Sequence, residues 1–505
     1  MNAWDGNDVI CNSTLLHYNL SGLLLERFFM KRGEIIENIE IEKLVFGGKG
    51  FVRLEDGKVA FITGGAIPGS RVNIKITKKR KDFYEAQITE VLVKSKIETE
   101  NYDLFPGAPW MNIDYKEQLK IKQTQIEESM FHLRKHQPEI NFLDIIPAPK
   151  QFGYRNKIEF SFGKYISHRE EIFEDFNVGF HKRGEFSKVE DYDECLLIDD
   201  EQNKIYKKIK DFAKDSGLPV YDQKIGTGFF RHLMIRKMHF SGEILLVFSV
   251  FSKYFESLEN TDLNEKEVFD EIKIFLKNLA EEEKNIKSTY ISHNSNKADT
   301  LIGDMELVYG NETISENLLG LSFDIGPKSF FQTNSEGAEI LYSLVKDFAK
   351  QEELSNGTVL DLYGGTGTIG MIFADIAKNV VSVELNEEAS TNGAKNALKN
   401  GIENIEFVNA KVEDFLEKYL EQENKAELLI IDPPRAGMHP SALPNILKFG
   451  TRQIIYVSCN PATLARDLGY ILENSDYKIE KIQAVDMFPH THHIETVVSL
   501  TKKLK

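Results

Sequence analysis

The sequence predicts a multidomain α/β protein with a small OB-like N-terminal β-barrel, a central α+β domain and a C-terminal Rossmann-like domain. Three regions support this prediction. Residues 34–96 alternate apolar and polar residues in short runs separated by Gly and Pro turns. Residues 97–320 mix strand-like and helix-like periods without a repeat. Residues 321–505 contain apolar runs that each lead through a polar turn into a helical period, which is typical of a parallel sheet.

The composition is that of an ordinary globular protein with room for two to four domains. The chain has 505 residues, 41% of them hydrophobic and 28% charged, and no apolar run reaches membrane-spanning length. Three cysteines, Cys11, Cys195 and Cys459, exclude a disulfide framework and a four-cysteine metal site within one chain. We therefore expect a cytoplasmic protein without a membrane partner. Residues 1–33 are expected to be a tail of unknown role, with Met30 as an alternative start.

The charge distribution indicates where nucleic acid could bind. A net charge of −17 argues against a protein that coats nucleic acid indiscriminately, because phosphate binding requires clustered Lys and Arg. Residues 34–96 nevertheless contain 12 Lys and Arg against 9 Asp and Glu, and the positive residues cluster in KITKKRKD. Such a run is either a solvated hairpin or a nucleic-acid contact. Because it belongs to a small barrel, we expect Lys78–Lys81 to contact a nucleic-acid backbone.

The central region contains two stretches that mix basic and aromatic residues. These are GYRNK, residues 153–157, and FFRH, residues 229–232. Both suit base stacking and phosphate contact, and both are also ordinary chemistry at a strand edge. The surrounding periods predict helices over residues 115–133, 199–217 and 264–283 and a β-hairpin over residues 232–250.

A glycine-rich turn follows the first strand of the C-terminal region. TVLDL leads into GGTGTIG, residues 364–370, where a ligand can approach the backbone closely. The next strand ends at Glu384, 23 residues after Asp361, where a carboxylate can accept hydrogen bonds from ribose hydroxyls. The turn lacks both the GxGxxG pattern and a phosphate-binding Lys. It therefore favours adenosine without a phosphate chain, and S-adenosylmethionine is such a ligand.

Two further strands end at residues with reactive side chains. ELLIID ends at Asp432, which begins the rigid turn DPPR, and QIIYVS ends just before Cys459. Asn460 and Pro461 then begin a helix, and a helix N-terminus favours the thiolate, although a buried structural cysteine is the alternative. Because ligands bind at the carboxyl ends of parallel strands, Asp432 and Cys459 are expected to line one cleft. Glu495 begins the last strand.

Five ordered motifs resemble the RNA uracil-5-methyltransferase family, namely SFFQTN, DLYGGTGTIG, IIDPPRAG, VSCNPATLARDL and FPHTHHIETVVSL. IEKLVFGGKGFVR and GAIPGSRVNIKI are similar to the TRAM domain, an OB-like RNA-binding barrel, so the resemblance covers roughly residues 34–505. It implies S-adenosylmethionine-dependent methylation of uracil C5 in RNA, with 23S ribosomal RNA favoured as the partner of a monomer. A covalent bond to uracil C6 is implied for Cys459, with Glu495 as general base. The implied S-adenosylmethionine contacts are Gln332, Tyr363, Glu384 and Asp432.

The sequence departs from this family in two places. The family often has Cys where Gly364 stands, and a chain with Gly there is still expected to bind the cofactor. Several members hold an iron–sulfur cluster through closely spaced cysteines between the barrel and the central domain, but FPGAPWMNIDYKEQLK contains none. Cys195 is at most a remnant of one ligand, so no cluster is expected.

Four other interpretations stay open. A relative that methylates the T-loop uracil of transfer RNA would share every motif. An exocyclic-amine methyltransferase uses a related acid-Pro-Pro turn but needs no cysteine, so Cys459 and Glu495 argue against it. His490, His492 and His493 could suggest zinc, but three histidines in one turn rarely reach a single ion, and no metal is expected. A pure RNA-binding module is the fourth.

Overall fold

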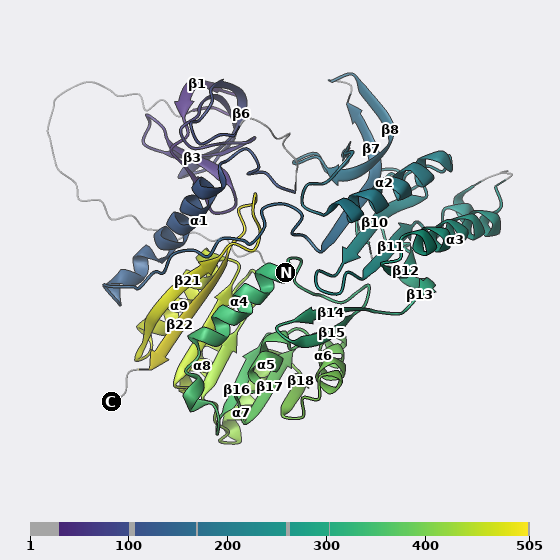
Figure 1. Ribbon diagram of the computed structural model, residues 1–505. Coiled ribbons are helices and arrows are strands. Elements are labelled where there is room, and N and C mark those ends of the chain that lie inside the picture. The colour runs from purple at the N-terminus through teal and green to yellow at the C-terminus, as the bar shows by residue number, and fades with distance from the viewer. Residues whose placement is uncertain (1–29, 100–106, 168–169, 259–262, 302, 503–505) are drawn as a thin grey trace, which may run out of the picture.

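The computed structural model describes residues 30–99, 107–167, 170–258, 263–301 and 303–502, so most of the predicted tail lies outside the described residues. Three large sheets follow one another along the chain, with helices packed on the second and third (Figure 1). The predicted α/β class is therefore confirmed. No helix of the described residues is long and apolar enough to cross a membrane.

The N-terminal region forms a six-stranded sheet in the order β1-β5-β6-β4-β3-β2. Its alternating sequence gives it a separate core, because every second side chain points inward; in RVNIKITKK, Val72, Ile74 and Ile76 are fully buried. The predicted basic run lies at the turn between the two longest strands, where all four side chains are exposed. The strands are β1 (Ile35–Glu40), β2 (Lys43–Val45), β3 (Lys49–Arg53), β4 (Val59–Thr63), β5 (Arg71–Lys79) and β6 (Phe83–Val93).

The predicted central region, residues 97–320, is not one packed unit. Helix α1 (Tyr115–Met130) packs with the C-terminal domain, because Ile126 and Met130 share a core with that domain's last helix. Phe142 and Ile146 then form parallel bridges to the edge of the C-terminal sheet. The sequence hid this placement because α1 buries Gln118, Lys122 and Gln125, so its apolar residues alone mark no clear face.

A seven-stranded sheet in the order β13-β12-β11-β10-β7-β8-β9 makes up the rest of this region. Helices α2 and α3 share one apolar core with it, in which Phe229 and Phe230 are fully buried. The elements are β7 (Lys157–Ser167), β8 (Ile172–His181), β9 (Val189–Asp191), α2 (Asp200–Asp215), β10 (Phe230–Lys237), β11 (Ile244–Val250), α3 (Glu265–Glu282), β12 (Ile286–His293) and β13 (Asp304–Gly310).

A hairpin of β14 (Ile314–Leu318) and β15 (Leu321–Ile325) leads into the C-terminal domain. The boundary expected between residues 320 and 321 falls in its two-residue turn. Both strands pack in the same core as the first helix of the C-terminal domain, since Leu318 and Phe323 share that core with Leu341. The same core also contains Met234 and Leu245 of the central sheet, so the hairpin lies between the central sheet and the C-terminal domain.

The C-terminal sheet has the order β18-β17-β16-β19-β20-β22-β21, with β22 antiparallel to both of its neighbours. Helices cover both faces, because neighbouring residues of a strand point to opposite cores: Val359 joins that of α4–α6 and Leu360 that of α7–α9. The elements are α4 (Ser335–Phe348), β16 (Thr358–Leu362), α5 (Thr368–Phe373), β17 (Asn379–Glu384), α6 (Glu387–Lys399), β18 (Ile405–Asn409), α7 (Val412–Glu421), β19 (Leu428–Ile431), α8 (Ala442–Phe449), β20 (Gln453–Ser458), α9 (Pro461–Glu473), β21 (Tyr477–Val485) and β22 (Glu495–Lys502).

Candidate active site

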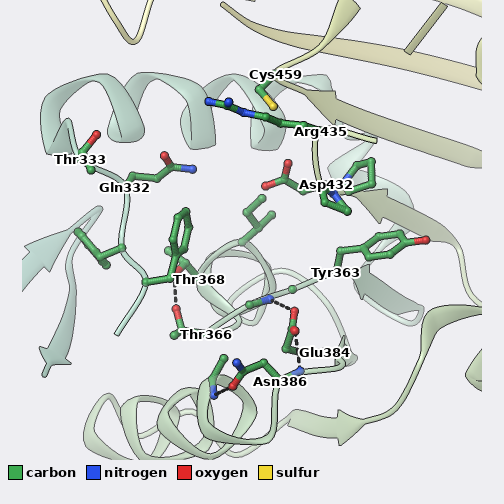
Figure 2. Close-up of a pocket in the computed structure, with 18 of the residues that line it drawn as sticks. Gln332, Thr333, Tyr363, Thr366, Thr368, Glu384, Asn386, Asp432, Arg435 and Cys459 are labelled. Carbon is green, nitrogen blue, oxygen red and sulfur yellow. Dashed lines mark hydrogen bonds between the residues drawn. The ribbon is translucent and has the colours of Figure 1, made fainter. Parts of the chain in front are cut away.

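One cavity of about 1290 Å³ opens at the carboxyl ends of the parallel strands of the C-terminal sheet. Its wall also includes residues from the central region and from the segment before α4, and Figure 2 shows part of this lining. The structure brings together all the site residues expected from the sequence, since the lining includes Gln332, Tyr363, Glu384, Asp432, Cys459 and Glu495.

The glycine-rich turn forms one end of the cavity. Gly365 and Gly367 both adopt left-handed φ angles, 57° and 69°, which glycine tolerates without a steric penalty. Glu384, at the end of β17, accepts hydrogen bonds from the backbone N–H of Gly365 at 3.0 Å and of Asn386 at 2.7 Å (Figure 2). The carboxylate is therefore fixed beside the turn, and it still lines the cavity.

Two carboxyls stand at the ends of the adjacent strands β16 and β19, of which Asp361 is fully buried and Asp432 is partly buried. Asp361 accepts hydrogen bonds from the Gly370 backbone N–H and the Ser382 hydroxyl, at 3.0 and 3.1 Å. Burial raises the pKa of Asp361 to about 6 and, together with the charge of Asp361, raises the pKa of Asp432 to about 7. Asp432 thus titrates near neutral pH.

Gly364 stands at the position where the family often has Cys, and its surroundings leave little room for a side chain. A Cβ atom built there would lie 2.1 Å from the Ser382 hydroxyl oxygen and 2.8 Å from Asp361 Oδ2. A side chain at this position would therefore require Ser382 and Asp361 to move. The glycine suits the hydrogen bond between these two residues.

Gln332 and Tyr363 lie on opposite sides of the drawn cavity (Figure 2). Asn156 holds the Gln332 backbone, because its amide nitrogen donates to the Gln332 carbonyl at 2.8 Å, which leaves the Gln332 side chain at the cavity wall. Tyr363 has a left-handed φ of 63°, unusual for a residue other than glycine. Figure 2 shows its ring pointing away from Gln332, so Tyr363 contributes most directly through the shape of the turn.

Cys459 stands on the predicted strand-to-helix turn. Asn460 caps α9 by accepting from the Ala462 backbone N–H at 3.1 Å, and Pro461 occupies the first helical turn. The thiol is half-buried, and burial raises its pKa to about 11, with the charges of Glu495 and Asp432 acting in the same direction. A backbone hydrogen bond at the helix N-terminus lowers the pKa of Cys459, as expected, but burial and the nearby carboxyls outweigh this effect.

Glu495 lies beside Cys459 across the sheet. The two residues flank the paired residues Ser458 and Thr496 of β20 and β22. Glu495 is buried, and burial together with the charge of Asp432 raises its pKa well above its ordinary value. The cation that opposes these shifts is Arg435, which lowers the pKa of both Cys459 and Glu495 and lies next to Cys459 in Figure 2.

Arg435 has a place in the site that the sequence prediction missed, although its motif DPPR was noted. The other cations at the cavity wall include Arg155, Arg183 and Lys328, from the central region and the segment before α4. Only Arg155, in GYRNK, carried a sequence signal, because the other two lie in turns without a recognisable motif.

The second basic and aromatic stretch does not reach this site. Phe229 and Phe230 are fully buried in the central core. Arg231 donates to the backbone carbonyls of Asn294, Asn296 and Ala298. The interpretation of residues 229–232 as a stacking surface is therefore wrong, because the aromatic faces are used in packing.

The three histidines near the C-terminus occupy two different environments. His490 is buried and stacks on Phe152 at a ring-centroid distance of 4.6 Å, whereas His492 and His493 line the cavity. Burial lowers their pKa values to about 4, 4 and 3, so all three are neutral at pH 7. The described residues contain no group of three His, Cys, Asp or Glu side chains placed to hold a metal ion. Cys195 is buried in the central core.

The chain matches a family model described as tRNA (Uracil-5-)-methyltransferase over residues 114–503. Two relatives, both named as uncharacterized RNA methyltransferases, come from Caldanaerobacter subterraneus and Clostridium tetani. They are 36% and 37% identical over 94% of this chain and 100% and 99% of the relative. The crystal structure of Pyrococcus abyssi tRNA (uracil-54, C5)-methyltransferase in complex with S-adenosyl-L-homocysteine is also similar. It is 28% identical with a TM-score of 0.67, covering 92% of this chain and 100% of that one.

The raised pKa of Cys459 predicts slow alkylation at neutral pH. The rate at which iodoacetamide alkylates this thiol should rise with pH and reach half of its maximum near pH 11, because only the thiolate reacts. Glu495→Gln removes a negative charge and should lower the midpoint, whereas Arg435→Met should raise it. Mass spectrometry of the Cys459 peptide measures the rate.

Arg452→Met is the matched control, because Arg452 pairs with Glu353 and does not line the cavity. A midpoint below the ordinary cysteine value of about 8.5, or one that neither cavity variant moves, would contradict this electrostatic description.

Proposed function

This chain belongs to the tRNA (uracil-5-)-methyltransferase family, and from that premise we propose that it methylates uracil C5 in RNA with S-adenosylmethionine. It is a methyltransferase. The observation that carries the proposal is the placement of Cys459 and Glu495 at neighbouring ends of β20 and β22, in one cavity with Glu384. A thiol, a buried carboxyl and an acidic glycine-rich turn are what covalent C5 methylation requires.

The residues at the glycine-rich turn fit S-adenosylmethionine. The fixed carboxylate of Glu384 can accept hydrogen bonds from ribose hydroxyls, and the open left-handed position of Gly365 leaves room for an adenosine next to the backbone. We propose that Gln332, Tyr363, Glu384 and Asp432 hold the cofactor, with Tyr363 acting through its backbone. When bound, S-adenosylmethionine supplies a methyl group carried by a positively charged sulfur.

The protein's own residues supply the remaining chemistry. Uracil C5 is a poor nucleophile, so the Cys459 thiolate first forms a bond to C6, and the displaced electron pair makes C5 nucleophilic. C5 would then bond to the methyl group as the methyl–sulfur bond breaks, which leaves that sulfur neutral. Glu495 takes the C5 proton, the C5–C6 double bond returns, and the C6–sulfur bond breaks to release the thiolate. These reaction steps balance in atoms and charge, and they require no further reagent.

The electrostatics of the cavity suit these steps. A carboxylate with a raised pKa is a stronger base than an exposed one, so Glu495 can take a proton from carbon once it is ionised. The same shifts favour the protonated forms of Cys459 and Glu495. We propose that Arg435 favours the anionic forms when the substrate enters, because its charge opposes both shifts.

The cations at the cavity wall support RNA as the substrate. Arg155, Arg183 and Lys328 line the cavity wall, on a protein whose net charge is −17. We propose that the N-terminal sheet is a TRAM-type barrel and that Lys78–Lys81 contact phosphates. Within the barrel, Glu85 pairs with Lys78 at 3.2 Å and with Arg80 at 3.5 Å, which offsets part of the positive charge.

The target favoured by the barrel is 23S ribosomal RNA. The T-loop uracil of transfer RNA is the second candidate, because the similar Pyrococcus abyssi enzyme acts on uracil-54 of tRNA. An exocyclic-amine methyltransferase is disfavoured, since amine methylation gives Cys459 and Glu495 no role. Both cysteines of the described residues are free thiols, which supports the cytoplasm as the compartment. The monomer and the absence of an iron–sulfur cluster stay predictions.

The covalent step can be trapped in one variant and abolished in another. Cys459→Ala should abolish methyl transfer, since the reaction loses a covalent route worth roughly 4 kcal/mol or more. Glu495→Gln should fail later, because the methylated adduct keeps its C5 proton and cannot eliminate. A denaturing gel with labelled RNA should therefore show a shifted band for Glu495→Gln and none for Cys459→Ala. Full activity of Cys459→Ala would exclude this mechanism.

The exposed basic run should contribute to RNA affinity by contacting phosphates. Replacing Lys78, Lys79, Arg80 and Lys81 by Gln should weaken RNA binding and flatten its salt dependence by about one unit of slope per lost phosphate contact, with S-adenosylmethionine binding unchanged. Filter binding at several salt concentrations measures both. The matched control replaces four exposed lysines of α2 and α3, Lys207, Lys214, Lys266 and Lys277. If both quadruple variants lose affinity equally, the barrel has no special role.

The RNA target can be identified by mapping 5-methyluridine in cellular RNA. In a strain that lacks this protein, 5-methyluridine should disappear from a site in 23S RNA and return when the wild-type protein, but not Cys459→Ala, is supplied. Mass spectrometry of purified 23S RNA and transfer RNA measures the modification. Loss from the T-loop of transfer RNA alone would replace the first target by the second.

A further inference from the structure

The loop of residues 486–493 connects β21 to β22 and leads directly to Glu495. Its base is the strand pair Val485–Glu495, the last pair between these strands. Four of its side chains, Phe488, Thr491, His492 and His493, line the active-site cavity. The position of this loop therefore affects both the cavity wall and the general base.

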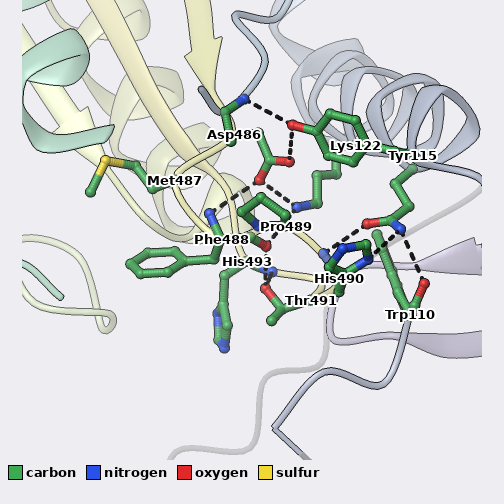
Figure 3. Close-up of polar contacts among 12 residues, drawn as sticks. Trp110, Tyr115, Lys122, Asp486, Met487, Phe488, Pro489, His490, Thr491 and His493 are labelled. Atoms are coloured by element: carbon green, nitrogen blue, oxygen red, sulfur yellow. Dashed lines mark hydrogen bonds and ion pairs between the residues drawn. The ribbon is translucent and has the colours of Figure 1, made fainter. Parts of the chain in front are cut away.

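A buried ion pair holds the base of the loop. Lys122 of α1 donates to Asp486 Oδ1 at 2.7 Å and to the Phe488 carbonyl at 3.2 Å, and both charged side chains are fully buried. Asp486 also accepts from the Tyr115 hydroxyl at 3.0 Å and from the Phe488 backbone N–H at 3.2 Å (Figure 3). A helix more than 360 residues earlier in the sequence thus fixes the residue next to Val485.

The tip of the loop is held by the same part of the chain. The Gln118 side chain accepts from the His490 backbone N–H at 2.8 Å and lies 3.0 Å from His490 Nδ1. The Trp110 backbone N–H donates to the His490 carbonyl at 2.9 Å. His490 has a left-handed φ of 64°, a conformation that persists only where surrounding contacts hold it. Figure 3 shows these contacts gathered on one side of the loop, opposite the side chain of His493.

The barrel touches the loop as well. The rings of Phe46 and His492 meet edge to face at a centroid distance of 6.2 Å. A Cβ atom at Gly48 would lie 3.4 Å from His492 Nδ1. The loop is therefore packed against three consecutive parts of the N-terminal region: the barrel, the segment at Trp110 and α1.

A contribution to stability does not by itself explain the buried Lys122–Asp486 ion pair. Removing two charges from water costs free energy that their attraction often fails to recover, and an apolar pair in the same space is often as stable. Helix α1 already has an apolar contact with the C-terminal domain through Ile126 and Met130. What an apolar pair could not supply is the set of directed hydrogen bonds to Asp486 and to the Phe488 backbone.

We propose that Lys122 and Asp486 are positioning residues of the methyl transfer reaction, which hold the 486–493 loop so that Glu495 faces the C5 proton of the target uracil. The proposal rests on the proposed function. It assigns part of the catalytic geometry to α1, outside the domain that carries Cys459, Glu495 and the glycine-rich turn.

The test replaces the pair by neutral side chains of similar size, Lys122→Met with Asp486→Asn, which leaves no unpaired buried charge. Turnover should fall about 10- to 100-fold through misplacement of the base, while S-adenosylmethionine affinity stays within twofold. The rate with RNA deuterated at uracil C5 should fall further than with ordinary RNA, because proton removal becomes rate-limiting. Wild-type protein should show a smaller isotope effect.

Lys120→Met is the matched control, because Lys120 lies on the same helix and forms an exposed pair with Glu117. It should keep the wild-type rate and isotope effect. If the double variant does not fold, Tyr115→Phe removes one hydrogen bond to Asp486 and should shift the isotope effect in the same direction.

The proposal is overturned if the double variant keeps wild-type turnover, or if its turnover falls only in proportion to its folded fraction with an unchanged isotope effect. A wild-type protein that methylates RNA without losing the C5 hydrogen would instead overturn the proposed function, and this proposal with it. The two failures are distinguishable, because the second appears already in the wild-type protein.

Discussion

The site depends on the reversed direction of one strand. Parallel strands bring their carboxyl ends to one edge of a sheet, and β16, β17, β19 and β20 do so here. Because β22 runs antiparallel to β20, it presents its first residue, Glu495, at that same edge. A parallel β22 would have put Glu495 at the opposite edge, remote from Cys459. The pairing of Ser458 with Thr496 therefore sets the thiol beside the carboxyl.

Carboxyls and cations both line the cavity. Asp361, Asp432 and Glu495 have raised pKa values, and burial is the main cause of each shift. Cations from the central region line the wall as well. Carboxyls suit a cofactor with a positively charged sulfur, and cations suit a polyanion. Arg435 lies beside the thiol and lowers the pKa of both Cys459 and Glu495.

Much of the site could be predicted because local signals specified it. Asp432 and Cys459 each follow an apolar strand and precede a turn with Pro, so the edge they share could be inferred from short windows. The pKa of Cys459 could not, because it depends on Glu495 and Asp432, which are distant in sequence. The placement of α1 was missed for a related reason: its buried face contains Lys122 and Gln118, whose partners are 364 and 372 residues away. Phe229 and Phe230 showed the reverse error, since core aromatics resemble a stacking surface in sequence.

Under the proposed function, methyl transfer replaces the hydrogen at uracil C5. The most direct measurement uses RNA tritiated at uracil C5 together with S-adenosylmethionine carrying a carbon-14 methyl group. One tritium should be released into water for each methyl group that enters the RNA, and release should depend on Cys459. Methyl incorporation with full retention of tritium would contradict the account, because the methyl group would then lie on another atom of the RNA.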